Sequence, residues 1–238
     1  LVQMRTGDLK GALKSATAAV KASSNPKSQT LAPHASAGVK NQKSLALFRL
    51  SEAQFRASQN EAAIETAQKA IALYQELGDL SGAGRAHWSL ALSSFLMGNA
   101  EASRPAATTA LELCQQAGDP YGIGNALNVI AQTDTDLVES IQHYQQAWQA
   151  FETAGYLERQ SAAIGNLANA YAELGLYPHA LRLYDEVIEI ARRVGAKIGL
   201  TVSLGNMIST EITLGRRELA RSRMAELTEV TTAVDDPL

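Results

Sequence analysis

The sequence predicts an all-α protein built from a repeated helix-turn-helix unit, because residues that end helices recur at a nearly constant period. One series of breaks, spaced 40, 37 and 40 residues apart, consists of Gly78, Gly118, Gly155 and Gly195. A second series falls midway, at Ser58, Gly98, Gly175 and Gly215, with Thr135 in the missing place. Glycine tolerates the left-handed conformation that stops a helix, so two interleaved series indicate two helices in each repeat.

Between these breaks, the apolar residues follow helical spacing. The stripe before Gly175 is Ile164, Leu167, Ala168, Tyr171 and Leu174, and the stripe after it is Tyr177, Ala180, Tyr184, Val187 and Ile188. Steps of three and four place such residues on one face of a helix. No window alternates polar and apolar residues over a convincing length, so we expect no strands.

In chain order, the breaks predict an unpaired helix followed by five helix pairs. We expect the unpaired helix at 8–22, a long loop at 23–38, and pairs at 39–77, 79–117, 119–154, 156–194 and 196–231. The loop is expected because this segment, with four Ser and two Pro, breaks the period. The whole chain, 1–238, is expected to form a single domain in which each pair buries its apolar face on its neighbours. Because the chain opens at Leu1 inside a repeat-like segment, we also expect a fragment of a longer polypeptide.

Prolines and one short repeat refine these bounds. Asp119 and Pro120 are expected as the N-cap and first residue of a helix, and Pro178 fits a first turn. Pro105 should kink its helix or delay the helix start to Ser103, because proline cannot donate an interior hydrogen bond. The 119–154 pair is three residues short, so its first helix should end near Thr133.

Composition excludes several classes of protein. The 21 Lys and Arg residues against 24 Asp and Glu give a formal net charge of -3, which argues against a nucleic-acid binder. A mean hydropathy of -0.11, without a long apolar run, argues against a membrane partner or span. The lone Cys114 excludes an internal disulfide and a cysteine metal site, and favours a reducing, cytoplasmic location.

No catalytic constellation is evident, so we expect no enzyme activity and no cofactor within this chain. Gly82-Ala83-Gly84 and Gly122-Ile123-Gly124 imitate a dinucleotide loop, but neither follows a strand and both lack a third glycine. We interpret these glycines as easing tight packing where helices start. Cys114 lies on an apolar stripe and is expected to be an inert core thiol.

A metal site is not expected either. The four histidines, His34, His87, His143 and His179, fall in different repeats and never pair four residues apart. Asp134, Asp136 and Glu139 resemble part of a calcium loop, but the glycine and third acidic ligand of that loop are missing. We interpret Asp136 with Glu139 as a helix N-cap arrangement.

The best-matching segment is similar to a known repeat. It reads Leu167-Ala168-x-x-Tyr171-x-x-Leu174-Gly175-x-Tyr177-x-x-Ala180-x-x-x-Tyr184 and resembles the tetratricopeptide repeat. The long period of about 40 residues resembles the subclass found in kinesin light chains, Pins-type adaptors and bacterial signalling proteins. The resemblance implies a right-handed α-α superhelix, with Ala168 and Ala180 where two helices approach closely.

The resemblance also implies a concave groove, lined by the first helix of each pair, that holds a peptide. The residues expected to line this peptide site are Phe48, Glu52, Arg85, Trp88, Phe95, Asn128, Gln132, Asn166, Asn169, Asn206 and Ser209. Aromatic residues in the first two pairs could anchor apolar side chains, and amides in the last three could bond to a peptide backbone. Gly165 and Gly205, beside two of the amides, leave room for close approach.

Each part of this site has an alternative. Trp88 and Phe95 could be core residues, and Phe48 and Phe55 could pack against the unpaired helix or the 23–38 loop. The amides of Asn166 and Asn169 could bond between repeats. The leading hypothesis is a non-catalytic module that binds a protein or peptide partner. The alternatives are a regulatory arm that restrains an output domain of a larger signalling protein, and a scaffold that forms a homodimer through its end helices.

Overall fold

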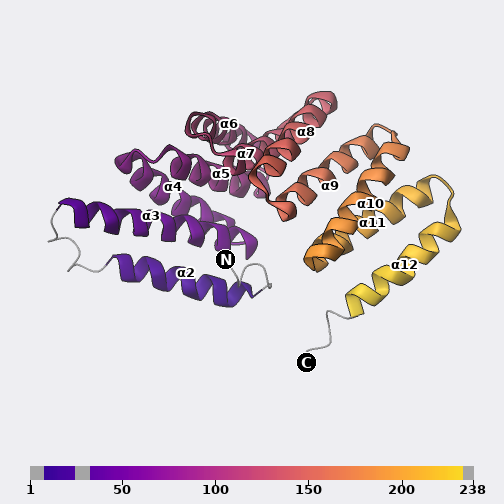
Figure 1. The fold of residues 1–238 in the computed structure, drawn as a ribbon, viewed down its shortest axis with the longest axis horizontal. Helices are drawn as coiled ribbons and strands as arrows, with labels where there is room; N and C mark the ends of the chain where they lie inside the picture. Colours follow the sequence, from indigo (N-terminus) through magenta and orange to yellow (C-terminus); the bar gives the residue numbers. More distant parts are fainter. Residues whose placement is uncertain (1–7, 25–32, 233–238) are drawn as a thin grey trace. The chain divides into compact units, whose positions relative to one another are not determined.

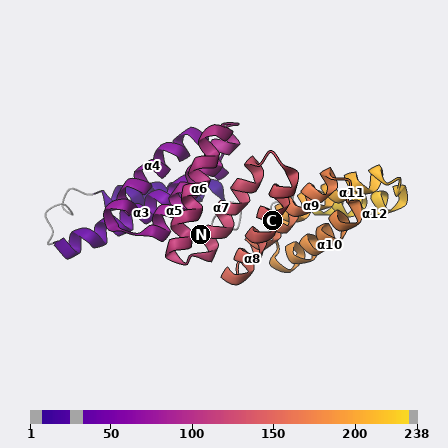
Figure 2. The same cartoon turned by 90° about the horizontal axis from the view of Figure 1, so that it is seen from above.

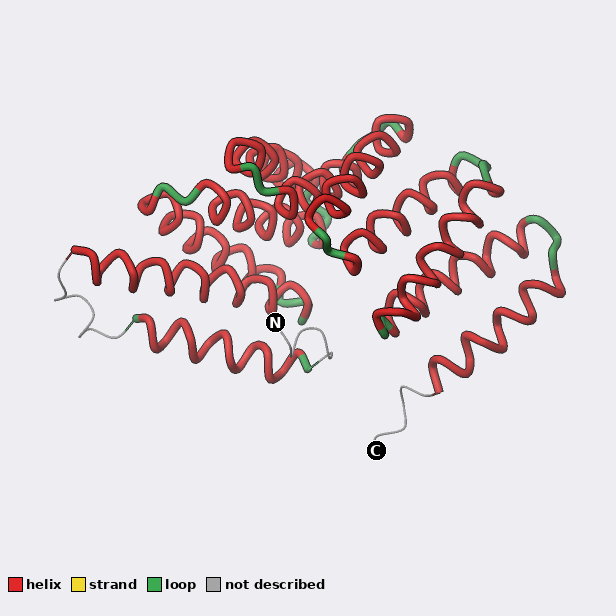
Figure 3. Tube along the Cα trace, viewed as in Figure 1, coloured by secondary structure: helices red, strands yellow, loops and turns green. Residues whose placement is uncertain are grey.

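The computed structural model describes residues 8–24 and 33–232, which form eleven helices and no strand within those ranges (Figure 3). The chain divides into two compact units, Leu1–Thr133 and Asp134–Leu238, here called unit 1 and unit 2. In chain order the described helices are one orphan followed by ten helices at the places that the sequence predicts. The expected 119–154 pair is divided between the units, because Pro120–Thr133 belongs to unit 1 and Leu137–Ala154 to unit 2. The expectation that the chain is a single domain stays a prediction.

The described residues of unit 1 form six helices, each packed against the next (Figure 1). They are α2 (Leu9–Ser23), α3 (Pro33–Arg56), α4 (Asn60–Leu77), α5 (Leu80–Leu96), α6 (Ala100–Ala117) and α7 (Pro120–Thr133). The first helices of successive pairs also meet, α3 with α5 and α5 with α7. We call these three helices the first-helix row of unit 1.

In unit 2, residues 134–232 form five helices, each again packed against the next (Figure 2). They are α8 (Leu137–Ala154), α9 (Leu157–Glu173), α10 (Tyr177–Val194), α11 (Lys197–Thr213) and α12 (Arg217–Thr232). Helix α9 contacts α11 as well as α10, so α9 and α11 form the first-helix row of unit 2. Ala168 on α9 and Ala180 on α10 are both fully buried, which is expected for small residues where two helices cross closely.

The helix breaks have the backbone conformation that the sequence predicts. All seven glycines of the two series have positive φ, between 63° and 76°. Ser58 takes the same left-handed conformation with φ of 59°, the one non-glycine residue to do so among the described residues. The capping predictions also hold, because Gly122 donates its backbone N–H to Asp119 and Val138 donates to Asp136. Helix α7 ends at Thr133, as expected from the short repeat.

One expected boundary was wrong, and one of the two alternatives expected for Pro105 is excluded. Residues 33–38 were expected in the loop but belong to α3, whose first residue is Pro33. Proline suits the first position of a helix because its missing N–H would have no partner there. Helix α6 starts at Ala100 and contains Pro105, so its start is not delayed to Ser103. The side chain of Asn99 caps this helix by accepting the N–H of Ala102 at 3.0 Å, which stabilises the earlier start.

Aromatic residues form the centre of the unit 1 core. Phe48 and Phe55 of α3 both meet the ring of Trp88 on α5 edge-on, with ring centroids 6.5 and 5.8 Å away. Alanines fill the narrow spaces between the helices around them. Within the described ranges, no helix is long and apolar enough to cross a membrane.

Candidate functional site

Two asparagines from successive first helices bond directly to each other in unit 2. The Nδ2 of Asn206 on α11 donates to the Oδ1 of Asn169 on α9 at 2.9 Å. The same oxygen accepts the hydroxyl of Tyr184 on α10 at 2.6 Å. Asn169 is therefore held in one orientation by two neighbouring helices.

This pair leaves one donor and one acceptor unused. Within the described part of the chain, the Nδ2 of Asn169 and the Oδ1 of Asn206 make no hydrogen bond. Both side chains are half-buried. The Nδ2 of Asn169 and the Oδ1 of Asn206 are not enclosed by protein atoms, so both reach solvent. A donor beside an acceptor matches the hydrogen-bonding groups of a peptide unit.

Open space adjoins this amide pair. A Cβ on Gly205 would meet no atom within 4 Å, and a Cβ on Gly165 would meet only Val187, at 3.9 Å. Both glycines lie inside helices, where glycine costs about 1 kcal/mol relative to alanine. Internal packing gives no reason for either glycine, whereas each leaves room for a ligand to approach the helix backbone.

Tyr184 is a stable donor in this arrangement. Burial raises its pKa to about 12, and the negative charge of Glu173 acts in the same direction, while a hydrogen bond with Thr210 opposes them. The hydroxyl therefore keeps its proton at physiological pH and can donate to Asn169. This role of Tyr184 was not predicted from the sequence, although its place on the apolar stripe of α10 indicated that it faces α9.

The other polar residues predicted for this site lie on α9, on α11 or in unit 1. Asn166 is half-buried on α9, and Ser209 is exposed on α11. In unit 1, Asn128 and Gln132 are half-buried on α7, and the buried Oε1 of Gln132 has no hydrogen-bond partner within the described residues. The bond between Asn169 and Asn206 shows that bonding between repeats, the alternative stated for the amides, does occur.

The aromatic part of the predicted site is mostly core. Phe48 and Trp88 are each 2% exposed, so neither can anchor a ligand on the surface of unit 1 as arranged. The physical reason is their mutual packing with Phe55, which encloses all three rings between α3 and α5. Phe95 is half-buried, so part of its ring is accessible to a ligand.

The two charged residues predicted for the site are both engaged. The carboxylate of Glu52 is buried and accepts from Arg49 at 2.5 Å. Arg85 donates two hydrogen bonds to the carboxylate of Asp119, from Nε at 2.6 Å and from Nη2 at 2.8 Å. Its guanidinium also lies over the ring of Tyr121, 5.1 Å from the centroid. Arg85 thus links α5 to α7.

Burial of Asp119 would raise its pKa, but the hydrogen bonds from Arg85 and Ser81 and the charge of Arg85 outweigh this effect and lower it. The carboxylate is therefore ionised at neutral pH. Among the described residues, no three His, Cys, Asp or Glu side chains lie close enough together to hold a metal ion. Cys114 is a fully buried free thiol, as its apolar stripe indicated.

Comparisons with known proteins support the repeat architecture. Residues 161–194 match the family model described as tetratricopeptide repeat. A comparison with curated proteins finds no match. Among solved structures, BtubC from P. vanneervenii shares 14% sequence identity with a TM-score of 0.73, over 97% of this chain and 93% of that chain.

Two further solved structures have related architecture. A STAND protein with a tetratricopeptide repeat sensor, from Pyrococcus horikoshii, is 17% identical with a TM-score of 0.65, over 83% of this chain and 31% of that chain. A Rap protein complexed with competence and sporulation factor is 17% identical with a TM-score of 0.63, over 82% of this chain and 65% of that chain. At such identities, the likeness establishes the fold alone.

Proposed function

Because this chain carries a tetratricopeptide repeat and folds as an array of such helix pairs, we propose that it is a non-catalytic module that binds a peptide segment of a protein partner. The segment lies along the first-helix row of unit 2, over α9 and α11. The observation that carries this proposal is the amide pair Asn169–Asn206, which keeps one free donor and one free acceptor beside two unpacked glycines.

The chemistry of this surface favours main-chain recognition. Carboxamides bond to a peptide backbone without demanding a charged side chain. Gly165 and Gly205 allow that backbone to approach the helices closely. Exposed apolar side chains on the same helix, Ile198 at 80% and Val202 at 55%, offer contacts for apolar residues of the segment. The Rap protein with its bound factor is a precedent for a ligand on this architecture.

A peptide selection would test the proposal. A phage-displayed library of random peptides is selected on the full chain, and the recovered peptides are titrated by calorimetry. We expect Asn206→Ala to weaken binding about tenfold, because one buried hydrogen bond to the ligand and the support of Asn169 are both lost. Gln149→Ala, at an exposed position on α8, is the matched control and should bind normally.

A regulatory arm within a larger signalling protein is a second candidate. The STAND protein favours it, because there the tetratricopeptide repeat is named as a sensor and the matched part is 31% of the chain. The full-length reading frame would test this reading, since an adjoining output domain is its requirement.

A further inference from the structure

Two carboxylates in unit 1 occupy equivalent places in successive repeats. Asp79 precedes α5 and Asp119 precedes α7, 40 residues later. Each accepts the N–H of a glycine three residues on, Gly82 at 2.8 Å and Gly122 at 3.2 Å. The two sites can therefore be compared position by position with an offset of 40.

At Asp119, an arginine of the same chain fills the space in front of the carboxylate. Arg85 binds Asp119 through two hydrogen bonds, and Ser81 donates to it at 2.7 Å. Such a paired, charge-assisted contact is among the strongest that a guanidinium makes. Asp119 is 7% exposed as a result.

In the first site, the equivalent arginine is missing. The residue 40 positions before Arg85 is Leu45, and the residue 40 positions before Ser81 is Asn41. Leu45 is apolar and 50% exposed. No ion pair reaches Asp79 from any residue that the structure describes, and its carboxylate accepts one hydrogen bond from those residues, from the N–H of Gly82.

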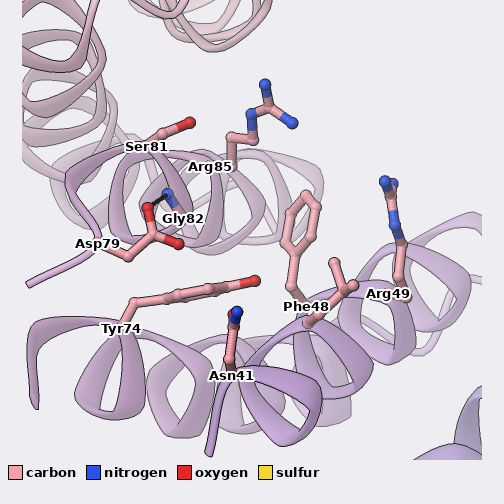
Figure 4. A pocket seen from close by; sticks show the side chains of 9 residues that line it. Asn41, Phe48, Arg49, Tyr74, Asp79, Ser81, Gly82 and Arg85 are labelled. Carbon is pink, nitrogen blue, oxygen red and sulfur yellow. Dashed lines mark hydrogen bonds between the residues drawn. The ribbon is translucent and has the colours of Figure 1, made fainter. Parts of the chain in front are cut away.

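A pocket of about 160 Å³ lies where that arginine would be (Figure 4). The pocket is lined by Asn41 and Leu45 of α3, Tyr74 of α4 and Asp79, together with further residues of α3 and α5. Figure 4 shows the hydroxyl end of Tyr74 and the amide of Asn41 directed into this space. We call it the Asp79 pocket.

The charges around the pocket leave one carboxylate unbalanced. Arg49 and Arg85 also line it, but Arg49 pairs with Glu52 and Arg85 pairs with Asp119. In Figure 4 both guanidinium groups point away from the carboxylate of Asp79. The remaining charge is the negative charge of Asp79, which favours a cation.

We propose that the Asp79 pocket accepts the guanidinium group of an arginine from a binding partner, in the place that Arg85 takes in the next repeat. The carboxylate of Asp79 accepts two N–H groups, and the amide oxygen of Asn41 accepts a third. Leu45, which is 50% exposed, contacts the methylene stem, which arginine buries readily on apolar surface. The pocket lies in unit 1 and does not depend on the amide pair in unit 2.

The capped tripeptide acetyl-Gly-Arg-Gly-amide is the probe, titrated into the full chain and followed by NMR. Its matched partner contains citrulline, which keeps the shape of arginine and lacks the charge. We expect the citrulline peptide to bind about tenfold more weakly, because charge-assisted hydrogen bonds are lost. Equal binding of the two peptides, or no binding of the arginine peptide, would overturn the proposal.

Asp79→Asn separates charge from folding, because asparagine also caps helices and can still accept the N–H of Gly82. We expect this variant to lose about tenfold in affinity for the arginine peptide. Asp185→Asn, at an exposed carboxylate on α10, should bind normally. Unchanged binding by Asp79→Asn, or an equal loss in Asp185→Asn, would contradict the proposal.

Leu45→Arg provides an independent test, with one readout, the melting temperature, that needs no ligand. The new side chain should place its guanidinium on Asp79, as Arg85 does on Asp119, raise the melting temperature and abolish binding of the arginine peptide. A crystal structure with Arg at position 45 directed away from Asp79 would count against the proposal. A titration with free L-arginine distinguishes the source of the guanidinium group. Weaker binding than that of the peptide indicates a peptide partner, whereas equal binding indicates a small guanidinium compound.

Discussion

The sulfur of Cys114 on α6 packs directly against the α-carbon of Gly122 on α7. A Cβ at position 122 would lie closer to this sulfur than real Cβ atoms come to any neighbour, and 2.9 Å from Oδ2 of Asp119. Cys114 also lies where a Cβ on Gly84 would stand, at 2.5 Å. The thiol thus limits how closely α5, α6 and α7 approach, and it accounts for Gly84 and Gly122 of the two Gly-x-Gly segments.

The first prediction follows from this contact. Gly122→Ala should lower the free energy of unfolding by about 2 kcal/mol, because the added methyl overpacks the contact between α6 and α7. Cys114→Ala in the same chain should recover part of the loss by removing the sulfur, giving a coupling energy of about 1 kcal/mol. Urea unfolding of the wild type, both single variants and the double variant measures this coupling. Strictly additive losses would show that the sulfur does not cause the effect.

The second prediction concerns the reactivity of Cys114. Burial raises its pKa to about 12, the charge of Asp119 adds to this, and Arg85 acts in the opposite direction. Because the thiolate is the reactive form, labelling by a thiol reagent at pH 8 should be about a thousandfold slower in the folded protein than in urea. Rapid stoichiometric labelling of the native protein would contradict this burial.

The third prediction concerns acid stability. The pKa of Asp119 is lowered in the folded state, so its ion pair stabilises the fold above the unfolded pKa and the contribution disappears as pH falls through the folded value. Asp119→Asn keeps a capping oxygen but should cost about 2 kcal/mol at pH 7. Below about pH 4 the difference from the wild type should shrink, because the wild-type carboxylate becomes protonated. Urea unfolding at pH 7 and pH 3 measures both values, and a constant difference would argue against the pair.

Much of the fold was predictable from local residue patterns. The left-handed conformation at Gly78 or Gly118 depends mainly on the residue itself, so the period of glycines revealed the helix ends. The start of α3 at Pro33 was missed, because a loop rich in Ser and Pro and a proline-initiated helix begin with similar composition.

The site was predictable only as a choice of helix face. Periodicity placed Phe48 and Trp88 on the first helices but could not give their depth, which depends on how rings from α3 and α5 fit together. The bond between Asn169 and Asn206 depends on the distance between α9 and α11, which packing determines. Likewise, the Asp79 pocket becomes evident only when its repeat is compared with the neighbouring one in space.

The fourth prediction separates stability from binding at Gly205. Gly205→Ala should raise the free energy of unfolding by about 0.5–1 kcal/mol, because alanine favours the helix and the methyl meets no atom within 4 Å. The same methyl occupies the space beside Asn206, so the affinity for a peptide selected on the chain should fall. Gly38→Ala is the matched control, an exposed helix position in unit 1 that is equally unobstructed and should stabilise without affecting binding. Thermal unfolding and calorimetric titration of both variants measure the two effects. If Gly205→Ala binds the peptide as tightly as the wild type, the ligand does not approach α11 at this glycine.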